Sequence, residues 1–111
     1  MRLYIATPIN ARTENTLAEK KKAARHRINF LKEIIWEDER FEDYDELVCT
    51  FDIKDIVEGT TEEEALGKCV TEVLKSDAIY LDHGWNVSKG CNLEYRTAKI
   101  YGKIIYEHDK M

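Results

Sequence analysis

Four short apolar segments alternate with three helical patterns, and this alternation restricts the possible folds more than any other feature of the chain. The apolar segments span 2–6, 46–51, 78–82 and 103–107, and the helical patterns span 13–38, 61–75 and 90–101. Strands that are joined through helices form parallel pairs with right-handed crossovers. The sequence therefore predicts an α/β fold: a flavodoxin-like or Rossmann-like parallel four-stranded sheet with strand order 2-1-3-4.

A chain of 111 residues is long enough for one core, so we expect residues 1–111 to form a single domain. Parallel sheets are covered on both faces. We expect the helices at 13–38 and 90–101 on one face and the helix at 61–75 on the other. The strand order places a switch point between the first and third strands, where open α/β sheets hold ligands.

The segment that follows the third strand carries the densest pattern of polar residues and glycines. Residues 81–94 read Leu-Asp-His-Gly-Trp-Asn-Val-Ser-Lys-Gly-Cys-Asn-Leu-Glu, which indicates a strand end, a loop and a helix start. A helix start offers backbone N–H groups and a partial positive charge to an anion. Glu94 either faces a ligand there or is a surface residue matched to the helix dipole, and its position at the switch point favours the ligand. Asp82 is either an acid of the same site or a turn-forming residue.

The turn after the first strand carries the other candidate segment, Thr7-Pro8-Ile9-Asn10-Ala11-Arg12. Pro8 is the only proline of the chain and stiffens this turn. Two motifs match a known family: Tyr4, Ile5, Pro8 and Ile9 fit Tyr-Ile-x-x-Pro-Ile, and a second set fits Gly-Trp-x-x-Ser-x-Gly-x-x-x-Glu, namely Gly84, Trp85, Ser88, Gly90 and Glu94. Together they resemble the nucleoside 2-deoxyribosyltransferase-like superfamily, in particular its branch of short proteins.

The resemblance implies cleavage or transfer of the N-glycosidic bond of 2-deoxynucleosides or their 5′-monophosphates, with Glu94 as the nucleophile and without a cofactor. It also implies a homodimer or larger homo-oligomer. We expect Glu94 and Asp82 as catalytic residues. The expected substrate-binding residues are Tyr4, Ala6, Thr7, Pro8, Ile9, Arg12, Cys69, Gly84, Trp85, Ser88, Lys89 and Gly90. Among these, Trp85 either stacks on a base or covers an edge of the core or a subunit interface.

Two positions differ from the classical transferases of that superfamily. Ser88 stands where they carry an aspartate six residues before the nucleophile, and Cys69 where they carry one eight residues before the residue matching Asp77. The related deoxynucleotide N-glycosidases have serine at the first position, where it contacts the 5′-phosphate. Because both changes remove acids, an alternative function stays open: a catalytically silent nucleotide-binding module that acts as a sensor or sequesters its ligand.

Composition excludes several classes of partner. The net charge of −5 argues against binding to nucleic-acid polymers. Cys49, Cys69 and Cys91 form no close pairs, so we expect neither a disulfide framework nor a metal site. Cys91, at a predicted helix start, is either a thiol of lowered pKa or a small packing residue. No apolar run is long enough to cross a membrane and the first residues lack a signal-peptide pattern, so we expect a cytoplasmic protein.

Overall fold

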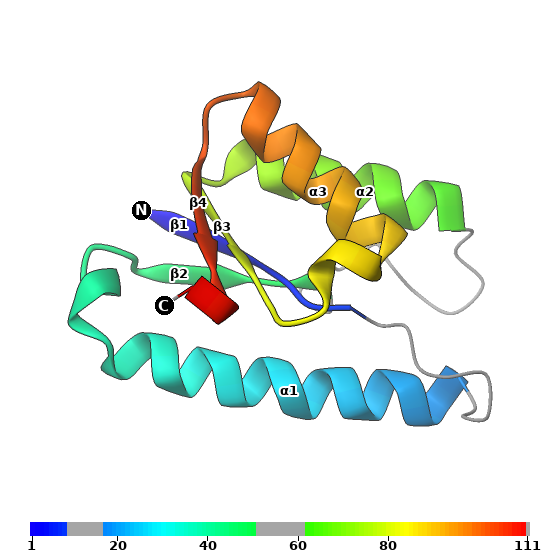
Figure 1. Ribbon diagram of the computed structural model, residues 1–111, viewed down its shortest axis with the longest axis horizontal. Helices are drawn as coiled ribbons and strands as arrows, with labels where there is room; N and C mark the ends of the chain where they lie inside the picture. The colour runs from blue at the N-terminus through cyan, green and yellow to red at the C-terminus, as the bar shows by residue number, and fades with distance from the viewer. Residues whose placement is uncertain (9–16, 51–61, 111) are drawn as a thin grey trace.

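The computed structural model describes residues 1–8, 17–50 and 62–110, and it has the predicted α/β architecture (Figure 1). The strands are β1 (Arg2–Ala6), β2 (Glu46–Val48), β3 (Ala78–Leu81) and β4 (Ile104–Glu107). The helices are α1 (Leu17–Glu37), α2 (Glu62–Lys75) and α3 (Lys89–Ile100), with short 3₁₀ turns η1 (Glu39–Phe41), η3 (Trp85–Val87) and η4 (His108–Lys110). All neighbouring strands are parallel and their order is β2-β1-β3-β4, which confirms the prediction.

The helices cover the two faces of the sheet differently from what we expected. Figure 1 shows α1 alone on one face and α2 with α3 on the other. The expected pairing of the first and third helices is therefore wrong, and the handedness rule explains why. The chain moves from β1 to β2 in one direction across the sheet, but from β2 to β3 and from β3 to β4 in the opposite direction. Right-handed crossovers that run in opposite directions place their helices on opposite faces.

Alternate residues of β1 belong to two hydrophobic cores, one on each face of the sheet. Leu3 and Ile5 point toward α1 and join the core that contains Ile28, Leu31 and Ile35. In the other direction, Tyr4 and Ala6 join the core under α2 and α3, with Val48, Cys69, Val73, Ile79, Leu81, Cys91 and Ala98. This alternation is the normal period of a strand. It brings the Tyr4 side chain beneath the two helices that carry Cys69 and Glu94.

The described residues contain no helix that is both long and apolar enough to cross a membrane.

Candidate functional site

Glu94 is buried between α3 and the sheet. Its side of α3 also carries Cys91, Thr97 and Ala98, which are buried at helical spacing against the core. Only 5% of Glu94 is exposed, and its Oε2 atom has no hydrogen-bond partner among the residues that the structure describes. Burial raises the pKa of Glu94 to about 7, although a hydrogen bond from Tyr4 acts in the opposite direction. The carboxyl group is therefore partly protonated at neutral pH and has spare capacity to bind a ligand.

Tyr4 forms the floor beneath this carboxyl group. The residue is fully buried, and its hydroxyl lies 3.2 Å from the Thr50 hydroxyl. Burial, and after it the negative charge of Glu94, raise the pKa of Tyr4 well above its usual value. Tyr4 therefore keeps its proton and serves as a hydrogen-bond donor to Glu94.

Cys69 completes a polar group that we call the Glu94 cluster: Glu94, Tyr4, Thr50 and Cys69. The Cys69 sulfur lies 3.6 Å from the Thr50 hydroxyl, and 5% of the residue is exposed. Its pKa is raised first by burial and then by the charge of Glu94. Position 69 thus lies beside Glu94. Thr50 was not among the expected residues, because the sequence pattern placed it inside a strand.

Cys91 is a packing residue in this arrangement. It is buried in the core under α2 and α3, and burial raises the pKa of its thiol to about 12. The charge of Glu94 is the second cause. Both effects oppose that of the helix start, so the structure favours the packing alternative for Cys91.

Asp82 is bound by an arginine that was not among the expected site residues. Arg27 of α1 donates from Nη2 to Oδ1 at 2.8 Å and from Nε to Oδ2 at 3.0 Å. The backbone N–H of His83 also donates to Oδ1, at 2.8 Å. Because α1 covers the face opposite to α3, the Asp82 carboxylate is directed away from the layer that carries Glu94. This geometry favours the turn-forming reading of Asp82 over the catalytic one.

Arg27 could have been found from the helical pattern of α1. It lies three residues after Ala24 and four before Leu31, which are both buried, so it borders the buried side of the helix. Arg27 also belongs to a basic run with Lys20, Lys21, Lys22, Arg25 and His26, and the sequence pattern indicates the solvated side of a helix for this run.

The loop after β3 lies against the turn after β1. Gly84 adopts the left-handed backbone conformation, with φ of 82°, and a Cβ atom placed there would lie 3.8 Å from Pro8 Cγ. The Ser88 hydroxyl accepts the backbone N–H of Cys91 at 3.3 Å and caps α3. A Cβ on Gly90 would lie 3.4 Å from a Leu66 methyl group, so this glycine allows α2 and α3 to approach closely.

Several other expected residues have different surroundings. The Trp85 ring packs on Tyr95, with centroids 4.7 Å apart, and the pair borders the core, as expected for a residue that covers a core edge. Lys89 is exposed and Ala6 is buried. The Thr7 hydroxyl oxygen, just after β1, is buried and has no hydrogen-bond partner among the described residues. Ile9 and Arg12 lie outside the described residues.

Within the described ranges, the His, Cys, Asp and Glu side chains form no group of three or more that could hold a metal ion.

Comparisons with known proteins identify a family but no individual relative. Searches of curated proteins and of solved structures give no match. The model of a domain family of unknown function, DUF4406, matches residues 1–107, which is nearly the whole chain. The chain therefore belongs to the DUF4406 family.

Proposed function

We propose that the protein cleaves or transfers the N-glycosidic bond of 2-deoxynucleosides or their 5′-monophosphates, with Glu94 as the nucleophile. The observation that carries this proposal is the Glu94 carboxyl group, which is buried near the switch point of the sheet with one oxygen that no described residue hydrogen-bonds. A buried carboxyl without full hydrogen bonding costs folding free energy. Groups that carry such a cost and a raised pKa are concentrated at functional sites.

The chemistry suits a poorly solvated carboxylate. As the bond between C1′ and the base nitrogen breaks, positive charge develops on the sugar, and a carboxylate in an apolar site stabilises that charge strongly. A Glu94 oxygen then bonds to C1′, while the base leaves with the electron pair of the broken bond and takes up a proton. Water, or a second base, next attacks C1′ and loses a proton, which releases the sugar and regenerates the carboxylate. Tyr4 holds the carboxylate in place throughout.

The start of α3 supplies the binding site for the 5′ end of the substrate in this proposal. Ser88 caps the helix through Cys91, which leaves the backbone N–H groups of Lys89 and Gly90 at the positive end of the helix dipole. The exposed Lys89 side chain adds a positive charge nearby. We therefore expect monophosphates to bind more tightly than free nucleosides, and calorimetry with matched pairs measures this directly. Equal or weaker binding of the monophosphates would contradict this part of the proposal.

The alternative is a silent nucleotide-binding module, and two observations favour it. Cys69 offers a thiol of raised pKa where the classical transferases have an acid, and Asp82 is occupied by Arg27. Protonation of the leaving base is thus weakly supported by the described residues. Slow hydrolysis or binding alone is the expected behaviour if solvent does not supply this proton.

The deciding experiment is chromatographic analysis of deoxynucleosides and deoxynucleotides incubated with the protein. Free base should accumulate with wild-type protein, and Glu94→Gln should abolish it while binding persists. Glu63→Gln, an exposed carboxyl on α2, is the matched control and should keep full activity. Binding without any base release would favour the silent module. Cleavage by Glu94→Gln at the wild-type rate would refute the assignment of Glu94 as the nucleophile.

We also propose that the protein is a cytoplasmic homo-oligomer, most simply a dimer. The resemblance supports the dimer, since members of that superfamily often complete their site with residues of a neighbour. Cys49, Cys69 and Cys91 are buried and form no disulfide, which is typical of a reducing compartment. Light scattering at micromolar concentration tests the dimer, and a monomer would refute it.

A further inference from the structure

β4 forms one edge of the sheet, and no described strand pairs with its outer side (Figure 1). Ile104 donates its N–H to the Asp77 carbonyl at 3.2 Å, as part of the ladder that joins β4 to β3. Every second residue of a strand faces the same neighbour, so Tyr106 also bonds to β3. The N–H groups of Ile105 and Glu107 and the carbonyl of Ile105 consequently point away from β3, toward the free edge.

An open hollow of about 420 Å³ lies along this edge. It is lined by three consecutive residues of the strand, Ile105, Tyr106 and Glu107, together with Tyr95 of α3 and Lys110. Because side chains of consecutive strand residues point to opposite faces, a hollow that all three line lies beside the backbone. Such an edge is a template for another strand.

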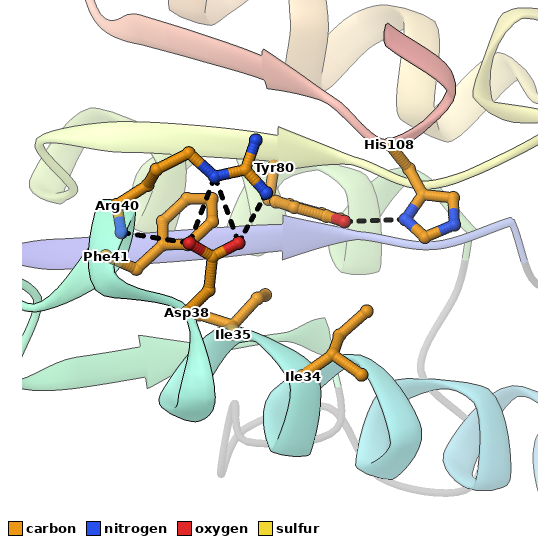
Figure 2. Close-up of a pocket in the computed structure, with 7 residues that line it drawn as sticks. All are labelled: Ile34, Ile35, Asp38, Arg40, Phe41, Tyr80 and His108. Carbon is orange, nitrogen blue, oxygen red and sulfur yellow. Dashed lines mark hydrogen bonds and ion pairs between the residues drawn. The ribbon is translucent and has the colours of Figure 1, made fainter. Parts of the chain in front are cut away.

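The end of β4 is held in place on the α1 face. His108 follows β4, and its Nδ1 atom lies 2.6 Å from the Tyr80 hydroxyl of β3 (Figure 2). The Tyr106 ring packs edge-on against Phe41 at a centroid distance of 4.8 Å, and its hydroxyl lies 3.2 Å from that of Tyr44. The edge is therefore preformed, and a partner strand does not have to order it first.

The side chains along β4 are complementary to a second copy of themselves. Lys103 and Glu107 lie on the same face as Ile105, two residues to either side of it. If two β4 strands pair antiparallel about Ile105, Lys103 of each copy lies opposite Glu107 of the other. Opposite charges in facing positions stabilise a strand pair, whereas a register centred on Lys103 or on Glu107 would bring like charges together.

The same register covers an exposed apolar residue on the other face. Ile104 is 47% exposed, and it would lie opposite Tyr106 of the second copy. A β-branched residue opposite an aromatic one is a favourable cross-strand pair. The backbones would bond between the two Ile105 residues, and each Glu107 N–H would donate to the Lys103 carbonyl of the other copy.

The helices leave room for this pairing. α3 contacts both β3 and β4, so it lies above these two strands. Neighbouring strands are about 4.8 Å apart, and a two-fold axis perpendicular to the sheet would then place the α3 axes of the two copies about 10 Å apart. That is the normal distance between packed helices.

We propose that two copies of this chain associate through the outer edge of β4, where their strands pair antiparallel about Ile105 and join the two sheets into one. This interface rests on the dimer proposed above. Existing contacts leave the ion pairs accessible. Lys103 Nζ donates to the Leu74 carbonyl at 2.9 Å and can exchange it for a carboxylate, which is the stronger acceptor. Lys110 Nζ lies 2.7 Å from Glu107 Oε2, and the other oxygen of that carboxylate can accept a second cation.

Charge reversal tests the register. Lys103→Glu and Glu107→Lys, each alone, place like charges in both facing positions and should weaken self-association about tenfold, as measured by light scattering over a micromolar concentration series. An equimolar mixture of these two variants restores opposite charges in both positions and should associate as tightly as the wild-type protein. Glu63→Lys, the same reversal at an exposed position of α2, is the control and should not alter association.

Amide hydrogen exchange, followed by NMR, reports on the edge itself. The N–H groups of Ile104 and Tyr106 bond to β3, so they should be protected in every variant that folds. Those of Ile105 and Glu107 should be protected in the wild-type dimer and in the mixture, and should exchange rapidly in each single variant. If a variant does not fold, the pattern of the wild-type protein still decides the question.

The outcomes separate this interface from the proposals on which it depends. A monomeric wild-type protein would overturn both the interface and the dimer. A dimer that both single variants retain would overturn the interface alone. Protection of Ile105 and Glu107 in a monomeric chain would mean that another segment covers the edge, which would also overturn the interface. Glu94→Gln should associate like the wild-type protein, because the pairing does not involve the proposed chemistry.

Discussion

Arg27 and Asp82 form a bidentate ion pair that joins α1 to the end of β3. Arg27 Nη2 donates to Asp82 Oδ1 at 2.8 Å, and Nε donates to Oδ2 at 3.0 Å. The Asp82 side chain is almost completely buried, whereas that of Arg27 is 36% exposed. Truncation of the arginine therefore leaves a buried carboxylate without its counter-charge. This pair, rather than Asp82 alone, holds the loop that leads to α3.

Arg27→Ala should lower the free energy of unfolding by about 3 kcal/mol, because a charge left alone in the interior carries its full desolvation cost. Urea denaturation at neutral pH measures the loss. Arg96→Ala, at an exposed position, should change stability by less than about 0.5 kcal/mol. A similar small change for Arg27→Ala would mean that water solvates Asp82 adequately and that the pair is not structural.

The stability of the protein should fall as the pH rises from about 4.5 to 7 because of Glu94. Its pKa is raised from 4.5 to about 7 in the folded state, so over this range the unfolded chain loses the proton first. The expected contribution is a loss of about 3 kcal/mol, complete above pH 7 and absent below pH 4.5. Glu94→Gln should remove this component, and the difference between the two stability curves isolates it. Parallel curves would show that Glu94 titrates normally.

Cys69→Asp should raise base release or transfer about 100-fold, the range of a general acid, since position 69 lies beside Glu94. It should also lower the melting temperature, because two carboxyl groups would then share one buried site. Cys49→Asp places the same charge in the core under α1 and should destabilise without any gain in activity. If neither variant gains activity and both lose the same stability, position 69 is not part of the site.

Gly84→Ala should destabilise the protein by about 1 kcal/mol, because an alanine is strained at a φ of 82°. Space is not the cause, since the new Cβ would lie at an ordinary distance from Pro8. Gly67→Ala is the control for which we expect the opposite sign. Gly67 lies in α2, where an added Cβ meets nothing within 4 Å, and the substitution should stabilise the protein by about 1 kcal/mol. Thermal melting of both variants tests this prediction. Equal shifts of the two melting temperatures in the same direction would contradict the argument from backbone conformation.

The sheet could be predicted from the sequence because each strand is a short apolar run and each connection contains a helical pattern. The observed order β2-β1-β3-β4 agrees with the predicted order 2-1-3-4. The predicted helix layers are wrong because each layer depends on the direction of its crossover, and this direction reverses after β2. Strand ends were also misjudged: β2 stops at Val48, although the apolar pattern continues to residue 51.

The candidate site was only partly predictable. Glu94 and Tyr4 stood out because of their positions in motifs, and the structure brings them together. Arg27 and Asp82 are 55 residues apart, and no local pattern links a helical arginine to a strand end. The burial of Cys91 likewise depends on the packing of α3 against the sheet, which a helix-start pattern does not report.

The half-protonated state of Glu94 affects how ligand binding should be measured. With a pKa of about 7, the group carries roughly half a proton in neutral solution. A ligand that binds only the ionised form releases this fraction of a proton from Glu94. The buffer takes up the released protons, and its heat of ionisation adds to the measured heat of binding. Binding heats should then differ between phosphate and Tris buffers by an amount set by the number of protons released. Calorimetry in two buffers thus counts the protons that leave Glu94 without any assay of turnover.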